Sequence, residues 1–343
     1  MSSIFSHGNE TVVSVSDGEI RNVAYAFDYR QPLLLIHLLY TVPSFIAYHK
    51  CRTFLTKESV TSSYFNVIFT NDFYINVALF IIDFLFTRLP ISGLFENLPS
   101  YIPEGIPMTI IYFLSYYLIY VNFYSITLIC INRMTSVLFP YYCNSFWQKN
   151  VRSAIALVYI LPLITTWHLV TYDAYFLPLY ENRSNYQMVY RVKLLIGFLP
   201  RNSTALCFVS ILLAVICVAA NFTTIVKYKT TIQTVKTASG TQNEFHRKRT
   251  RRVEIAMFSI ALVVCFSLVL QALLQALIMI YTGTSSFIRE TCQDLRAFAL
   301  DISICCPPWI MYYTTVHSHK TTITSNSISG VGIPTRSNVV VMK

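Results

Sequence analysis

The chain has 343 residues, of which 54% are hydrophobic, 15% are aromatic and only 12% are charged. This composition excludes an ordinary soluble globular protein. The formal net charge of +10 could suggest a nucleic-acid-binding protein, but the basic residues are spread between apolar segments instead of forming one such surface. We therefore expect a membrane protein that contacts lipid and does not bind nucleic acid.

Seven segments are long and apolar enough to cross a bilayer, whose hydrocarbon core of about 30 Å requires roughly 20 residues of helix. Seven such segments predict an all-α membrane protein, built as a seven-transmembrane helix bundle. Residues 1–30 form a polar outer segment, residues 31–316 the membrane domain, and residues 317–343 a Ser/Thr-rich tail. In chain order the predicted spans are 32–48, 66–87, 106–131, 151–172, 203–226, 253–281 and 296–316.

The charges between the spans predict the orientation of the bundle. With the N-terminus outside, the inner segments and span boundaries hold 17 of the 26 basic residues and only 3 of the 16 acidic residues. Because Lys and Arg are retained on the cytoplasmic side, we expect the N-terminus outside and the C-terminus in the cytoplasm. Two glycosylation sequons, at Asn9 and Asn182, then lie in outer segments and are candidate glycan sites.

Ionisable side chains inside the second and seventh spans need an explanation, since each costs at least about 2.5–3.5 kcal/mol at a helix centre. Asp72, Asn76 and Asp83 are four and seven residues apart, which places them on one face of the second span. Asp301 lies in the seventh span at a depth similar to that of Asp83. We expect the four side chains to form one polar network inside the bundle.

Two arginines flank this network at the outer boundary and are candidate partners for the carboxyl groups. Arg88 follows the second span and Arg296 begins the seventh. One interpretation is a structural network that holds helices together. The other is an ion-linked switch or a counter-charge for a ligand.

Phenols and amides recur at helical spacing in the outer half of two spans. Tyr112, Tyr116 and Tyr120 repeat every four residues in the third span, and Gln271 and Gln275 do so in the sixth. Such stripes are often simply packing, because the chain has 24 Tyr and 24 Phe. If they converge, they provide an outward-facing pocket for a small organic molecule.

The sequence carries none of the motifs expected of an enzyme. It lacks a phosphate-binding glycine-rich loop, a His-Glu-x-x-His motif and a recognisable nucleophile motif. The histidines show no metal-ligand spacing. We therefore expect a protein that is not an enzyme and that uses no cofactor.

Two motifs resemble a known family. The inner end of the third span reads Asn132-Arg133-Met134-Thr135-Ser136-Val137-Leu138-Phe139-Pro140, followed by Trp147-Gln148-Lys149. The seventh span contains Cys306-Pro307-Pro308-Trp309. These stretches resemble those of the nematode serpentine receptor class gamma, a family of seven-transmembrane chemoreceptors, although related nematode classes share parts of them.

The resemblance implies a receptor in the plasma or sensory-cilium membrane that couples an external chemical to a heterotrimeric G protein. Arg133 then matches the arginine at the cytoplasmic end of the third helix of rhodopsin-like receptors, while Asn132 replaces the neighbouring acid. The basic cluster containing Arg247, Lys248 and Arg249 is either an anionic-lipid contact or a docking surface for that partner.

A transporter or a ligand-gated channel for a small solute is the alternative. A seven-span transporter would typically show internal repeats with helices interrupted by Gly or Pro at matching positions. The prolines of this chain do not recur at matching positions, and no repeat is visible. The sequence therefore favours the receptor.

Overall fold

The computed structural model describes residues 29–58, 63–94, 101–178, 185–192, 202–237, 244–281 and 286–317. Seven long helices dominate these residues, joined by shorter helical turns and one pair of strands. The long helices are α1 (Arg30–Glu58), α2 (Ser63–Asp83), α5 (Ile106–Leu138), α6 (Pro140–Thr166), α7 (Asn202–Thr237), α8 (Glu244–Ile280) and α9 (Ser286–Met311). The shorter elements are η1 (Phe84–Arg88), α3 (Leu89–Ser92), η2 (Trp167–Thr171), β1 (Tyr172–Pro178), β2 (Tyr186–Val192) and η3 (Tyr312–His317).

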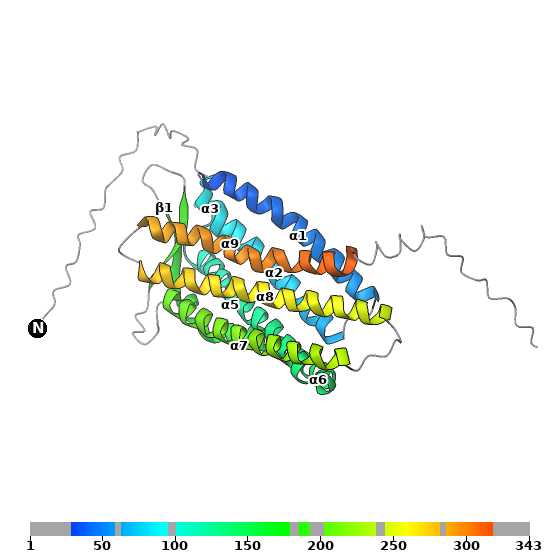
Figure 1. Ribbon diagram of the computed structural model, residues 1–343. Coiled ribbons are helices and arrows are strands. Elements are labelled where there is room, and N and C mark those ends of the chain that lie inside the picture. The colour runs from blue at the N-terminus through cyan, green and yellow to red at the C-terminus, as the bar shows by residue number, and fades with distance from the viewer. Residues whose placement is uncertain are drawn as a thin grey trace, which may run out of the picture.

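The long helices lie side by side in one bundle, and the strands cross one end of it (Figure 1). Helix α5 contacts α2, α6, α7 and α8, so it forms the centre of the bundle. Helix α9 packs between α1 and α8. We call the end that carries the strands the hairpin end, and the opposite end the inner end.

Six of the helices in the described residues are long and apolar enough to cross a membrane. On α1, the apolar side chains of Leu35, Leu39, Val42 and Ile46 lie on one helical face and are each at least half exposed, as expected for a surface that faces lipid. Helix α9 is long enough but more polar, because its hairpin-end half carries several charged residues. Such residues are tolerated where they face the interior of a bundle. The chain is thus a multi-pass membrane protein with a seven-helix serpentine fold.

The helices extend beyond the predicted spans at several ends. Helix α6 begins at Pro140, where the apolar segment begins only at residue 151, and α9 begins at Ser286, ten residues before the predicted span. A proline at the first helical position of α6 explains one of these starts, since its missing N–H has no helical partner there in any case. Hydropathy identifies only the apolar part of such a helix.

The strands are an exception to the all-α prediction. Strands β1 and β2 pair antiparallel, with Tyr172 opposite Val192 and Pro178 opposite Tyr186. The hydroxyl of Thr109 on α5 donates to the carbonyl of Tyr172 (2.9 Å) and accepts from the backbone N–H of Ala174 (3.2 Å). Thr109 therefore fixes β1 to the central helix.

Three tyrosine rings reinforce this attachment. The rings of Tyr172 and Tyr190 stack with centroids 4.9 Å apart, and Tyr190 also contacts Tyr112 of α5 at 5.5 Å. All nine cysteines of the chain lie in the described residues, and each is a free thiol. The hairpin is thus attached to the helices without a disulfide.

The other side of the hairpin reaches the end of α3. The side-chain amide of Asn185 donates to the carbonyl of Ile91 at 2.6 Å. Gly93, which follows α3, has a φ of 70°. A Cβ at this position would lie 3.0 Å from the Asn185 amide oxygen, so both the backbone conformation and the close approach favour glycine here.

Candidate functional site

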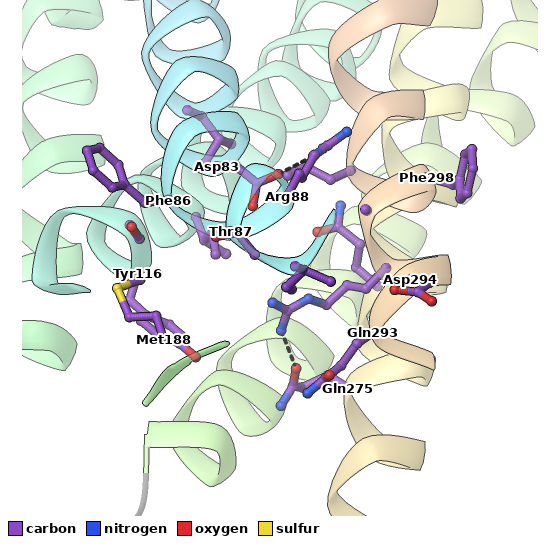
Figure 2. Close-up of a pocket in the computed structure, with 18 of the residues that line it drawn as sticks. Asp83, Phe86, Thr87, Arg88, Tyr116, Met188, Gln275, Gln293, Asp294 and Phe298 are labelled. Carbon is purple, nitrogen blue, oxygen red and sulfur yellow. Dashed lines mark hydrogen bonds and ion pairs between the residues drawn. The ribbon is translucent and has the colours of Figure 1, made fainter. Parts of the chain in front are cut away.

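A cavity of about 250 Å³ lies in the bundle beneath the hairpin. Every long helix except α6 contributes to its wall, together with η1, α3 and strand β2. Figure 2 shows that side chains from several of these elements surround one space. This volume suits a small molecule better than a peptide.

Four of the five predicted pocket residues line this cavity: Tyr112, Tyr116, Gln271 and Gln275. The Gln271 amide donates to the hydroxyl of Ser267 at 3.1 Å, and the Gln275 amide donates to the carbonyl of Ser203 at 3.4 Å. These bonds orient the two glutamine side chains across α7 and α8.

Tyr120 does not line the cavity. It is fully buried in the core around α5, and its hydroxyl has no hydrogen-bond partner among the described residues. The tyrosine stripe therefore divides into two cavity residues and one core residue.

Arg88 is the centre of a charged cluster between α2 and α9. Its Nε donates to Asp83 Oδ2 at 2.6 Å, while Nη1 and Nη2 donate to the two oxygens of Asp301, each at 2.8 Å. Arg88 is only 7% exposed, and Figure 2 marks its bond to Asp83. Arg88 thus binds Asp301 in the bidentate geometry, which is the strongest for an arginine–carboxylate pair.

The π-helical turn η1 explains how Arg88 reaches Asp83. In an α-helix, residues three and four apart face each other, whereas residues five apart do not. The wider turn over Phe84–Arg88 follows Asp83 directly and allows the contact across five residues. Such turns are often found at functional sites.

Helix α1 adds two polar side chains to this cluster. His37 Nδ1 lies 2.6 Å from Asp301 Oδ2 and 2.9 Å from Arg88 Nη1. The Tyr40 hydroxyl contacts both His37 and Asp301. The cluster, which we call the Arg88 cluster, thus joins α1, α2 and α9 through Asp83, Arg88, Asp301, His37 and Tyr40.

A second group of charges joins the starts of α1 and α9. Arg30 Nη2 donates to Glu290 Oε2 at 3.3 Å, and Arg30 Nε donates to Asp294 Oδ2 at 3.4 Å. The Tyr29 hydroxyl also donates to Asp294, at 2.8 Å. Partial burial and, next, this carboxylate raise the pKa of Tyr29 to about 12.

Arg296 stands apart from these groups. It lines the cavity, and its Nη1 donates to the amide oxygen of Gln275 at 3.0 Å, which Figure 2 marks as a dashed line to Gln275. Within the described ranges, no carboxylate oxygen lies within 4.0 Å of it. Arg88, not Arg296, is therefore the partner of the buried carboxylates.

Asp72 and Asn76 lie in a separate network deeper in the bundle. Asp72 accepts hydrogen bonds from the hydroxyls of Tyr48 and Ser125, both at 2.7 Å, and from the Asn76 amide at 3.0 Å. Asn76 in turn accepts a bond from Asn122 at 2.9 Å. The four predicted network residues thus separate into this group, which we call the Asp72 network, and the Arg88 cluster.

Several wall residues were not singled out from the sequence. Arg30 and His37 line the cavity from α1, as do Gln187 and Met188 from β2. Arg30 and His37 are seven residues apart, so they share a helical face, and this spacing of two polar residues in an apolar span is a signal that could have identified them.

Comparison with known proteins places the chain in a family. A model of the Srg family chemoreceptors matches residues 34–317, which include all seven long helices except the start of α1. The chain belongs to the Srg family.

The sequence identity to individual Srg proteins is low and covers less than half of this chain. The chain is 27% identical to serpentine receptor class gamma-31 of Caenorhabditis elegans over 152 residues, 42% of this chain and 49% of that protein. It is 28% identical over 138 residues to serpentine receptor class gamma-20 of the same organism, 39% of each chain. The matched region thus spans about half the length of these curated relatives or less.

The motif that resembles the family lies at the inner end of α5. Asn132 is buried, and its side-chain oxygen and nitrogen have no hydrogen-bond partner in the part of the chain that the structure describes. The guanidinium of Arg133 lies 4.4 Å from the ring centroid of Phe65 on α2. In this Srg chain, an aromatic ring therefore contacts the arginine where a rhodopsin-like receptor has a neighbouring acid.

The remaining predicted sites cannot be placed in the same way. Arg247, Lys248 and Arg249 lie within the helical backbone of α8, but their side chains are outside the described residues. The candidate glycosylation residues Asn9 and Asn182 and the tail 318–343 are also outside them.

Proposed function

We propose that this Srg family member is a chemoreceptor that binds a small external molecule in the cavity and activates a cytoplasmic heterotrimeric G protein. In this proposal the hairpin end faces outward and the inner end faces the cytoplasm. The observation that carries it is the cavity itself, because phenols, amides and charged groups from α1, α2, α5, α8 and α9 converge on one space beneath the hairpin.

The proposal also uses the charge pattern. The inner segments hold most of the basic residues, and the start of α8, which contains Arg247, Lys248 and Arg249, lies at the inner end. Arg133 lies at the same end of α5, where a guanidinium could donate to carbonyls of an inserted partner helix. Ligand and partner would therefore act on opposite ends of the same helices.

An open channel needs a continuous path through the bundle, whereas a transporter alternates between states that are closed on one side. Below the cavity, the side chains of Tyr120, Ile126 and Leu268 are almost fully buried in a packed core. A second cavity beside Asp72 has a volume of only about 10 Å³, close to the minimum for one water molecule. This closed packing shows no open channel in the described residues, and the transporter is disfavoured because the sequence shows no internal repeat.

Two epitope tags test the orientation. A tag at residue 1 should label on intact cells, whereas a tag at residue 343 should label only after permeabilisation. The opposite labelling would place the cavity on the cytoplasmic side and contradict a receptor for external chemicals.

A second experiment tests G-protein coupling. Cells that express the chain with a G-protein dissociation sensor are challenged with a panel of volatile and lipid-like molecules. Arg133→Ala should abolish most of any response while surface expression stays near the wild-type level, because the contact with Phe65 that is lost is worth only about 0.5–2 kcal/mol. Arg152→Ala, an exposed arginine on α6, is the matched control and should keep the response. No response to any compound, or equal responses in both variants, would contradict the proposed coupling.

A further inference from the structure

The three arginines that line the cavity differ in how their charge is balanced. Arg30 and Arg88 each lie between two carboxylates. Arg296 forms no ion pair with any described residue, and its one hydrogen bond there goes to the neutral amide of Gln275. A guanidinium has five N–H donors, so most of its hydrogen-bonding capacity remains for another molecule.

Gln275 positions this guanidinium without neutralising it. Its amide oxygen accepts from Arg296 at 3.0 Å, while its amide nitrogen donates to the Ser203 carbonyl of α7 at 3.4 Å. Arg296 is partly buried. The spare donors of this guanidinium face the cavity, where they can bond water or an anion, and only an anion would also balance the charge.

The other charges of the wall limit how negative such an anion can be. Asp83 and Asp294 line the same cavity, and each is bonded by its own arginine. Arg30 with Glu290 and Asp294, and Arg88 with Asp83 and Asp301, each have one more carboxylate than cation, and this surplus would repel a second negative charge on a ligand. One free guanidinium beside two carboxylates therefore fits a monoanion better than a phosphate dianion.

The rest of the wall is suited to an apolar body. Aliphatic and aromatic side chains come from α1, α5, α7, α8 and α9 around the polar groups. Those that line the cavity include Leu33, Leu34, Phe123, Leu206, Ile278 and Phe298. A ligand with one charged end and an apolar remainder would use both parts of this surface.

We propose that the cavity binds a small organic acid whose single carboxylate pairs with Arg296 and whose apolar part contacts these side chains. The planar guanidinium matches a carboxylate through two parallel hydrogen bonds, which an alcohol or an amine cannot form. The inference rests on the proposed function in one respect, that this cavity is the ligand site.

Matched compounds test the charge preference directly. The purified full-length receptor in lipid nanodiscs is titrated with hexanoate, hexan-1-ol and hexylamine, and with phenylacetate, 2-phenylethanol and 2-phenylethylamine, while its thermal unfolding is followed. Each carboxylate should raise the Tm at a lower concentration than its matched alcohol, and the amines should not raise it.

Variants assign the preference to Arg296. Arg296→Gln should weaken carboxylate binding at least about tenfold and leave alcohol binding unchanged. Arg296→Lys, which keeps the charge but loses the planar fork, should show a smaller loss. Arg191→Gln is the matched control, because Arg191 is exposed on β2, lies over the ring of Tyr175 and does not line the cavity.

Three results would overturn the inference. These are binding of an amine or alcohol as tightly as the matched acid, the same ranking of compounds in Arg296→Gln, and no stabilisation by any of the six compounds. No G protein is present in this assay, so acid binding without cellular signalling would refute only the proposed coupling. A cellular response to other molecules, without acid binding, would refute only the carboxylate inference.

Discussion

Asp72 and Asp83 lie on the same helix, yet the partners of their carboxyl groups differ in kind. Asp72 accepts hydrogen bonds from the side chains of Tyr48, Ser125 and Asn76, all neutral groups. Asp83 lies 2.6 Å from the guanidinium of Arg88, which also holds Asp301. The first setting is tightly packed, whereas the second adjoins the cavity.

The Asp72 network and the Arg88 cluster therefore differ in what holds them together. Hydrogen bonds from neutral side chains of α1, α2 and α5 to the Asp72 carboxyl group hold these helices together. In the Arg88 cluster, two carboxylates share one buried cation, so the loss of Arg88 leaves both carboxylates without their counter-charge. A charged ligand in the cavity would therefore affect the Arg88 cluster far more than the Asp72 network.

The largest expected effect comes from removing the shared cation. Arg88→Met should lower the free energy of unfolding by about 3–5 kcal/mol, because two buried carboxylates lose their partner. Unfolding of the purified protein in SDS measures this change. Adding Asp83→Asn and Asp301→Asn to the same chain should recover part of the loss, and a triple variant as unstable as the single one would contradict the charge argument.

Replacing either carboxyl group by an amide should lower the free energy of unfolding by a smaller amount, and the two losses can be compared directly. Asp301→Asn should cost about 1.5–3 kcal/mol, since hydrogen bonds to charged groups are lost. Asp72→Asn should cost less than about 1.5 kcal/mol, because an amide can still accept from Tyr48 and Asn76 while donating to the Ser125 hydroxyl. Equal losses in the same SDS titration would show that the two settings do not differ.

The third prediction concerns agonist potency. Asp83→Asn and Asp301→Asn should each shift the potency of an activating compound, and the double variant should shift it by less than the two single shifts combined. Both residues act through Arg88, so their effects cannot be independent. Concentration–response curves measure this, and strictly additive shifts would mean that the two carboxylates act separately.

The smallest effect is expected from removing one tyrosine hydroxyl. Tyr116 lines the cavity and Tyr120 lies in the core, so the same substitution at both positions distinguishes the two settings. Tyr116→Phe should weaken an activating compound by about two- to tenfold if its hydroxyl contacts the ligand. Tyr120→Phe, the matched control, should leave potency unchanged and should not lower stability, because its buried hydroxyl has no partner among the described residues. A potency loss in Tyr120→Phe alone would place the ligand deeper than the cavity.

The serpentine fold could be predicted from the sequence because the apolar segments are long and clearly separated, and the family assignment confirms it. Depth within a helix was harder to predict. Asp72 and Asp83 are 11 residues apart, or about 16 Å along an α-helix, so a shared face does not make a shared network. Between Tyr112 and Tyr120 the helix advances about 12 Å and turns by about 80° away from the cavity face.

Contacts between distant elements were the least predictable part. The second-span aspartates suggested a cationic partner, and Arg88 was one of two candidates. The choice between Arg88 and Arg296 depends on the π-helical turn at Phe84–Arg88, which hydropathy does not reveal. The strands were missed because their seven-residue alternation lies in a segment rich in tyrosine and asparagine, between two much stronger helical signals.

The way in which the hairpin is attached has a consequence for how this protein folds. Thr109 and stacked tyrosine rings hold the strands, and every cysteine is a free thiol. Correct closure over the cavity therefore requires no oxidant and no disulfide isomerase, and dithiothreitol should leave ligand affinity unchanged. Hydrogen bonds and ring contacts break and re-form far faster than a covalent bridge exchanges, so this attachment is reversible on a much shorter timescale than a disulfide would be.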